Sequence, residues 1–361
     1  MRLGLDVRLT YYQHGGISTY IRRLAEWLPR LAPEHTHLHF HRRGHHETLN
    51  PAARRIDCWT PSHHRLETLA LSVELLPHRL DVFHSPDFIP PRFGARCSVI
   101  TVHDLAFLRY PQFLTAESRR YYNGQIEDAV RRAAAISADS HATRLDLIER
   151  LRVPPQKITV IPLGLDPAFC PQPEDVVSRV LARHGLPRGY VLFVGTFEPR
   201  KNVPALVRAY AQLRDAPPLV LVGNTGWLFE ETARAIVALN LERRVRVLEN
   251  VPAEELPALY SGAAVLALPS LSEGFGLPVL EAMGCGTPVI IADRASLPEI
   301  AGEAALRINP EDEASLADAL ERVLGDSTLR ATLAARGADR VQHFQWETTA
   351  RATLELYARV G

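Results

Sequence analysis

The chain has 361 residues, of which 46% are hydrophobic and 23% are charged. This length suits two ordinary domains better than one, and the apolar content excludes a fibrous or wholly disordered chain. The 41 basic and 41 acidic side chains cancel, which argues against a uniformly basic nucleic-acid binder.

The two halves of the chain differ in charge. Residues 1–165 hold 22 basic and 16 acidic side chains, and the remainder carries the opposite excess. Paired arginines such as Arg22-Arg23 could face an anionic surface, although such pairs are more often solvated helix edges. Four widely spaced cysteines, with no CxxC pair, indicate neither a zinc ribbon nor a disulfide framework.

The first residues do not have the composition of a secretory signal. Asp6 interrupts the first apolar run, and no later run approaches the length of a membrane span. We therefore expect a cytoplasmic protein whose contact with the membrane, if it has one, is peripheral and at the inner face.

The first half alternates short apolar runs with helical patterns, which is typical of βαβ units around a parallel sheet. Strands are predicted at 3–7, 37–40, 82–84, 98–102, 135–138 and 157–161. Helices are predicted at 18–31, 116–133 and 142–151.

Three segments of the first half place glycine or polar residues directly after a strand. The string 13–20 contains Gly15 and Gly16, which let the backbone approach a ligand before the next helix begins, although paired glycines there usually form only a turn. His103 follows the strand 98–102, where a lone histidine is more often structural than catalytic. Ser140 and its neighbours are most simply the cap of the following helix.

The segment 161–173 contains four prolines, which interrupt strands and helices, and is predicted to be a linker. Beyond it, apolar runs recur at 191–195, 219–223, 245–248, 264–268 and 288–291. Runs without polar alternation suit strands that are covered on both faces. The sequence therefore predicts an α/β protein with two Rossmann-like doubly wound domains, 1–165 and 166–345, facing across a cleft at the carboxyl ends of both sheets.

The most informative segment is 269–289, which follows a buried strand and opens a helix that we expect to begin at Pro278. The backbone amides of 274–277 precede this helix, so they can bind a phosphate or hydroxyl oxygen with support from the helix dipole. Glu273 lies before the helix and Glu281 about one turn inside it. The two carboxylates are therefore expected to reach different parts of one ligand, for which sugar or ribose hydroxyls are suitable partners.

A second strand end carries positive charge. Arg200 and Lys201 follow the apolar run 191–195, and Lys201 is one of only two lysines in the chain. An arginine and a lysine at such a place can clamp a leaving diphosphate. By itself this pair would be read as solvated charges at a helix start.

Taken together, these motifs resemble the family-4 retaining glycosyltransferases of the GT-B fold over nearly the whole chain. The string EGFGLPVLEAMGCGTPV, from Glu273 onward, resembles the E-x7-E signature of that family. The Gly15-Gly16 pair, His103, the Arg200-Lys201 pair and the string FQWE at 344–347 also fall where the family pattern expects them.

The resemblance implies a role for each of these residues. Glu281 would hold the ribose of the nucleotide, and Glu273 would hold the transferred sugar. Arg200 and Lys201 would neutralise the diphosphate, and His103 would lie near the reacting centre. The remaining donor contacts implied by the resemblance are Gly15, Gly16, Thr196, Asn224, Val251, Gly274, Phe275, Gly276 and Leu277. The last helix, 346–361, would pack back on the first domain.

The sequence departs from the family pattern at Thr196, where many members carry an arginine. Arg200 could substitute, as in a subgroup with a PRKN string that includes bacterial mannosyltransferases. That likeness makes GDP-mannose the first choice of donor, ahead of UDP-sugars. The chain contains no Asp-x-Asp string, so the resemblance implies metal-independent transfer with retention, with no cofactor besides the nucleotide-sugar donor.

The residues leave other functions open. A sugar-nucleotide 2-epimerase shares this architecture and needs no acceptor, and an inactive sugar-nucleotide-binding protein would keep the fold without turnover. A phosphorylase using pyridoxal phosphate would need a Schiff-base lysine, for which only Lys157 and Lys201 are present. The acceptor is expected to be a glycan or a lipid-linked glycan, the latter at an anionic membrane surface that would suit the positive first domain.

Overall fold

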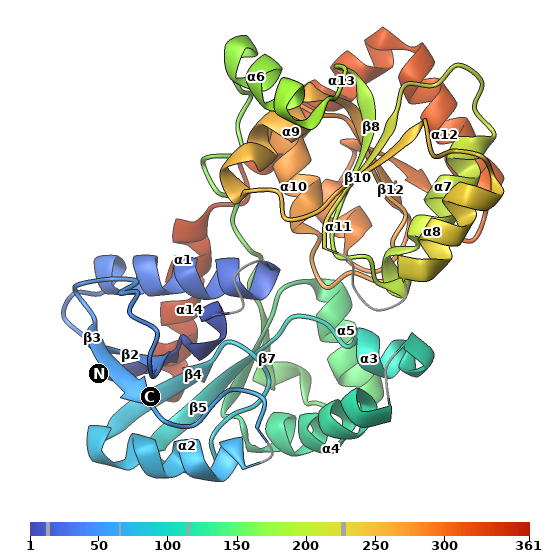
Figure 1. The fold of residues 1–361 in the computed structure, drawn as a ribbon. Coiled ribbons are helices and arrows are strands. Elements are labelled where there is room, and N and C mark those ends of the chain that lie inside the picture. The colour runs from blue at the N-terminus through green and yellow to red at the C-terminus, as the bar shows by residue number, and fades with distance from the viewer. Residues whose placement is uncertain (12–14, 65, 114–115, 225–228) are drawn as a thin grey trace. The chain divides into compact units, whose positions relative to one another are not determined.

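The computed structural model divides the chain into two compact units, Met1–Gly164 with Phe344–Gly361 and Leu165–His343 (Figure 1). It describes residues 1–11, 15–64, 66–113, 116–224 and 229–361. In these described parts, no helix is both long enough and apolar enough to cross a membrane.

The first unit is built on a parallel sheet of seven strands in the order β3-β2-β1-β4-β5-β6-β7. The strands are β1 (Arg2–Asp6), β2 (Thr36–Arg42), β3 (Arg54–Cys58), β4 (Leu80–Ser85), β5 (Ala95–Val102), β6 (Ala135–Ala138) and β7 (Ile158–Val160). The helices are α1 (Gly16–Leu31), α2 (Glu67–Leu75), α3 (Ala106–Arg109), α4 (Ala116–Arg132), α5 (His141–Leu151) and α14 (Trp346–Val360).

The second unit repeats this plan with six parallel strands in the order β10-β9-β8-β11-β12-β13. The strands are β8 (Tyr190–Val194), β9 (Leu219–Val222), β10 (Val245–Leu248), β11 (Ala263–Leu268), β12 (Val289–Ala292) and β13 (Ala305–Ile308). The helices are α6 (Glu174–His184), α7 (Val203–Ala211), α8 (Phe229–Ala238), α9 (Leu256–Gly262), α10 (Leu277–Gly284), α11 (Leu297–Ala301), α12 (Glu313–Gly325) and α13 (Ser327–Val341).

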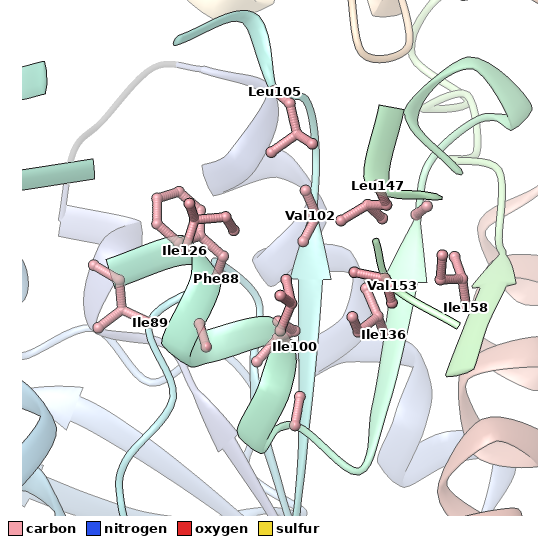
Figure 2. Packing of buried hydrophobic residues seen from close by; sticks show 14 residues of the cluster. Phe88, Ile89, Ile100, Val102, Leu105, Ile126, Ile136, Leu147, Val153 and Ile158 are labelled. Carbon is pink, nitrogen blue, oxygen red and sulfur yellow. The ribbon is translucent and has the colours of Figure 1, made fainter. Parts of the chain in front are cut away.

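The two-sided burial of these strands explains their sequences. β8 and β9 are buried at every position, as their unbroken apolar runs predict. In the first unit, side chains from β5, β6, α4 and α5 meet in one core cluster that includes Ile100, Ile126 and Leu147 (Figure 2). This packing holds the strand ends in place.

The helix α14 completes the first unit although it is the last element of the chain. The hydroxyl of Tyr357 hydrogen-bonds to Nδ1 of the buried His84 at 2.6 Å, and the hydroxyl of Thr349 donates to the carbonyl oxygen of Pro162 at 2.7 Å. A Cβ on Gly164 would collide with the backbone of Trp346. The glycine therefore allows the chain to pass close to the start of α14.

The strand order reverses in each sheet, between β1 and β4 in the first unit and between β8 and β11 in the second. Open parallel α/β sheets bind ligands outside the carboxyl ends of the strands at such a reversal. His103 follows β5, next to the first reversal, and Glu273 lies in the loop that follows β11 at the second. The topology thus places both residues at ligand-binding edges.

Candidate active site

Glu273 is the centre of a buried ion-pair cluster in the second unit. Its side chain is only 7% exposed. Oε1 accepts hydrogen bonds from Lys201 Nζ at 2.6 Å and from Ser270 Oγ at 2.8 Å, and Oε2 accepts one from Arg200 Nη1 at 3.1 Å. Both carboxylate oxygens are therefore occupied by groups of the protein.

Two loops are tied together to form this cluster. Arg200 and Lys201 belong to a 3-10 turn, Pro199–Lys201, between β8 and α7. The backbone amide of Leu271 donates to the carbonyl oxygen of Arg200 at 2.7 Å. The side chain of Asn202 donates to the carbonyl oxygen of Pro269 at 3.2 Å. The ion pairs are thus anchored by the backbone on both sides.

Opposite charges balance within this cluster. Burial alone would raise the pKa of Glu273, but the charges of Lys201 and Arg200 outweigh it and lower that pKa, so the carboxylate is ionised. Burial lowers the pKa of Lys201, and Glu273 opposes that shift. Arg200 also pairs with Glu198 at 2.7 Å. Two cations therefore face two carboxylates.

The glycine-containing loop after Glu273 is held in one conformation at the start of α10. Gly276 has φ +108°, and a Cβ there would lie 2.8 Å from Cδ2 of Leu297. The buried hydroxyl of Ser296 donates to the carbonyl oxygens of Glu273 and Phe275, at 2.9 and 2.8 Å. The loop is therefore a preformed N-terminal end of a helix, the kind of place that binds anions.

The helix α10 begins at Leu277, one residue before the predicted start at Pro278. Both positions lie in the first turn, where the backbone amides have no partner within the helix, so a proline is tolerated at either. Gly274 and Phe275 precede the helix in the same loop. The structure brings all four predicted amide positions, 274–277, to one end of α10.

Glu281 has different surroundings from Glu273. It lies inside α10, partly buried, and its Oε2 accepts a hydrogen bond from the hydroxyl of Tyr260 at 2.7 Å. Burial raises the pKa of Glu281 to about 7, while the Tyr260 hydrogen bond opposes that rise. One glutamate is thus held as a carboxylate, and the other titrates near neutral pH.

The other predicted donor contacts of the second unit lie at neighbouring strand ends. Thr196 follows β8 and is exposed, Asn224 follows β9, and Val251 follows β10. Asn224 accepts two hydrogen bonds. Its carbonyl oxygen accepts from the amide of Phe197 at 3.3 Å, and its side-chain oxygen accepts from the backbone amide of Asn250 at 3.3 Å. The structure therefore brings these three positions to the same sheet edge as Glu273.

In the first unit, His103 forms a pair that the sequence did not reveal. Its Nδ1 lies 2.6 Å from Oδ2 of Asp139, and its Nε2 lies 2.9 Å from the carbonyl oxygen of Pro86. Both ring nitrogens face acceptors, so both must donate and the ring is an imidazolium. Burial lowers the pKa of His103, but Asp139 outweighs burial and raises it to about 9.

Gly15 and Gly16 lie at the start of α1, with Gly15 as its N-cap residue and Gly16 as its first helical residue. Gln13 and His14, which precede them in the predicted string, lie outside the described residues. Ser140 caps α5 by accepting a hydrogen bond from the amide of Thr143 at 3.1 Å. The predicted cap is therefore confirmed.

Sequence reasoning missed three residues that shape these sites: Asp139, Tyr260 and Ser296. Asp139 could have been found, because it directly follows β6 and His103 directly follows the adjacent β5. Tyr260 and Ser296 lie in or beside helices, more than 20 positions from the glutamates they support. Nothing in the local sequence marks them.

Two doubly wound units, with a carboxylate, two cations and a helix N-terminus gathered at one sheet edge, define the class of GT-B glycosyltransferases. Models of two protein families match the chain, "Glycosyltransferase Family 4" over residues 14–169 and "Glycosyl transferases group 1" over residues 182–340. Together they cover both units.

Individual relatives agree with these matches. The chain is 33% identical to O-antigen chain mannosyltransferase B of Escherichia coli over 76% of its own length and 74% of the relative's. It is 36% identical to D-inositol 3-phosphate glycosyltransferase of Salinispora tropica, over 72% of its length and 58% of the relative's. Among solved structures, sucrose-phosphate synthase from Thermosynechococcus elongatus matches with a TM-score of 0.79 and 25% identity, over 99% of this chain and 98% of that one.

The chain belongs to the family-4, group 1 glycosyltransferases of the GT-B fold. It is an enzyme of a retaining family that takes its sugar from a nucleoside-diphosphate donor.

Proposed function

We propose that this glycosyltransferase moves mannose from GDP-mannose, with retention, to a hydroxyl of a glycan or a lipid-linked glycan. The observation that carries the proposal is the buried cluster of Glu273, Lys201 and Arg200 beside the N-terminus of α10. The preference for mannose rests on the PRKN string and on the similarity to a mannosyltransferase of O-antigen chains.

The donor is proposed to bind along the carboxyl edge of the second sheet. Glu281 would accept hydrogen bonds from the ribose hydroxyls, with the Tyr260 hydroxyl orienting its carboxyl group. Thr196, Asn224 and Val251 follow three adjacent strands, so they suit the base and the diphosphate.

The transferred sugar is proposed to meet Glu273 and the amides of 274–277. We do not assign Glu273 as a covalent nucleophile, because two cations and a hydroxyl already occupy its oxygens and lower its pKa. Such a carboxylate is a weak nucleophile, and its three hydrogen bonds leave about one lone-pair site for a sugar hydroxyl.

Arg200 and Lys201 are proposed to meet the negative charge that develops on the leaving diphosphate. Since Glu198 and Glu273 already balance their charges, the dipole of α10 is proposed to add to this stabilisation. Gly15 and Gly16 are proposed to add backbone contacts.

His103 is proposed to lie near the acceptor hydroxyl and the transferred sugar. An imidazolium with a pKa of about 9 cannot accept the proton of the acceptor at neutral pH. This supports a route in which the leaving phosphate oxygen takes that proton while His103 orients the reactants.

A panel assay tests this proposal. Nucleotide release is measured from GDP-, UDP-, ADP- and dTDP-sugars with glycan and lipid-linked acceptors, and GDP-mannose should be used fastest. Release that depends on an inositol phosphate acceptor would instead favour the activity named for the Salinispora relative. Conversion of the donor sugar to its epimer without nucleotide release would show a 2-epimerase.

A further inference from the structure

Exposed apolar side chains are concentrated in one part of the first unit. Of the ten large apolar side chains exposed in the described part of the chain, six lie between residues 59 and 93. They are Trp59, Leu66, Leu69, Val73, Leu76 and Phe93, which we name the α2 surface. Apolar side chains gathered on one area are uncommon on monomers and mark interaction sites.

The helix α2 is apolar on two faces. Leu71 and Leu75 are buried against the sheet, as expected for a helix that covers a core. Leu69 and Val73 point the other way, and Leu66 and Leu76 continue their line, because spacings of three and four residues fall on one side of a helix. The outward stripe therefore has the same character as the face that packs inside the protein.

Two further side chains widen this stripe, one on each side of α2. The amide of Trp59 donates to Oε2 of Glu74 at 2.7 Å, and the amide of Phe93 donates to Oγ of Ser72 at 3.2 Å. Glu74 and Ser72 lie on opposite sides of the outward stripe. Trp59, which is 75% exposed, and Phe93 therefore extend the stripe on the two sides of α2. Figure 1 shows the helix α2 below the sheet of the first unit.

The rim of the α2 surface is positively charged. The guanidinium of Arg43 lies 3.3 Å from the ring centroid of Trp59. Arg92 precedes Phe93, and Arg79 follows Leu76 by three residues; all three arginines are exposed. The carboxylate of Glu74 is directed to the backbone amides of residues 59 and 60.

We infer that the α2 surface docks on the headgroup region of an anionic lipid bilayer. An apolar helix face with tryptophan and arginine at its edge matches this environment, where aromatic rings and guanidinium groups sit between the acyl chains and the phosphates. The basic rim favours lipid phosphates over an apolar protein partner. The occupant is thus the membrane itself.

The position of α2 connects this surface to the candidate site. Glu67, its first residue, pairs with Arg8 at 2.6 Å, and Arg8 pairs with Asp6 at the carboxyl end of β1. The α2 surface therefore adjoins the sheet edge that also carries His103. Resting on the proposed function, this favours a lipid-linked acceptor that is presented from the bilayer to that edge.

Vesicle flotation tests the inference without using the enzymatic activity. The unmodified chain should float with phosphatidylcholine vesicles that contain phosphatidylglycerol, and more weakly with pure phosphatidylcholine. Leu69→Gln with Val73→Gln, at positions 47% and 59% exposed, should lower the partition coefficient at least about tenfold.

The chain offers a matched control. Leu145→Gln with Val237→Gln changes the same residue types at 51% and 61% exposure, far from α2 in sequence, and should leave flotation unchanged. Arg79→Gln with Arg92→Gln should weaken binding to the anionic vesicles only. Added salt should also weaken the binding of the unmodified chain to the anionic vesicles.

Three results would overturn the inference: no flotation of the unmodified chain, equal losses in the control variant, or a dimer in sedimentation equilibrium that only the α2 variant dissociates. Nucleotide release with a water-soluble acceptor is measured on the same samples. If that activity is absent while flotation behaves as expected, the proposed function fails and the docking surface stands.

Discussion

Each unit has a cluster of charged side chains at the carboxyl ends of its strands. The two clusters differ in whether all of their carboxylate oxygens have hydrogen-bond partners. In the second unit, both oxygens of Glu273 are taken up by Lys201, Arg200 and Ser270. In the first unit, Oδ2 of Asp139 binds His103, while its buried Oδ1 has no hydrogen-bond partner among the described residues.

The second unit therefore has the more completely preformed cluster. The cluster around Glu273 is a closed network of balanced charges, suited to holding one ligand in one orientation. The pair of His103 and Asp139 keeps an unused acceptor, which a ligand hydroxyl could satisfy. This agrees with the proposal that the donor binds to the second unit and the acceptor near the first.

The largest effect is expected from a variant that removes the carboxylate at the centre of the second unit's cluster. Glu273→Ala should lower turnover by orders of magnitude, because it removes the proposed sugar contact. It should also lower the free energy of unfolding by about 3–5 kcal/mol, because Lys201 is left buried without its partner. Steady-state kinetics and urea unfolding measure the two effects.

A double variant separates the two effects. Glu273→Gln with Lys201→Met removes both charges, so its loss of stability should be smaller than the sum of the two single losses. Turnover should stay low in all of these variants. Near-normal rates in a folded single variant would contradict the assignment of the site.

The pair in the first unit gives a pH-dependent effect. The pKa of His103 is raised above its unfolded value of about 6.5, to about 9. The stability from this pair is therefore fully present below about 6.5 and is lost as the pH rises through about 9. Urea unfolding across this range should show a loss on the order of 3 kcal/mol, and Asp139→Asn should abolish the pH dependence.

A variant of His103 tests whether the first unit acts in transfer and not in donor binding. His103→Gln should slow transfer by about a hundredfold while leaving nucleotide binding nearly unchanged, since the donor is proposed to bind in the second unit. Calorimetric titration with GDP checks the binding. A large loss of GDP affinity would mean that the two clusters do not divide donor and acceptor in this way.

A smaller effect is expected from the loop that shapes the closed cluster. Gly276→Ala places a Cβ at φ +108°, 2.8 Å from Leu297, and should cost about 1–3 kcal/mol of unfolding free energy. Thermal unfolding measures it, with Gly325→Ala as a control because a Cβ there meets no atom within 4 Å. Equal shifts in both variants would argue against a strained loop.

The smallest expected effect concerns Glu281. Its pKa is raised to about 7, and ribose hydroxyls that donate to its carboxylate should lower it. Nucleotide binding should therefore release up to about one proton below that pH and none well above it. Calorimetry in buffers of different ionisation heat measures the release, and Glu281→Gln should remove it.

The architecture was largely predictable because buried parallel strands leave continuous apolar runs. The elements that were not predicted include the strands β3 and β13 and the helix α2. β3 is an edge strand of the first sheet with the sequence Arg-Arg-Ile-Asp-Cys, so it has no apolar run. β13 is a short edge strand of the second sheet, and Arg307 interrupts its apolar residues. The helix α2 is apolar on both faces, so its sequence carries no amphipathic period.

Local residue types were enough to predict two doubly wound sheets, because buried strands need apolar runs. They also placed Arg200, Lys201 and Glu273 after strands, and Glu281 in the helix that follows. The partners of these groups are set by the folding of the chain. The opposite pKa shifts of the two glutamates, the pairing of His103 with Asp139 and the outward apolar face of α2 arise from contacts between distant segments. Charge and burial depend on neighbours in space, which local sequence does not specify.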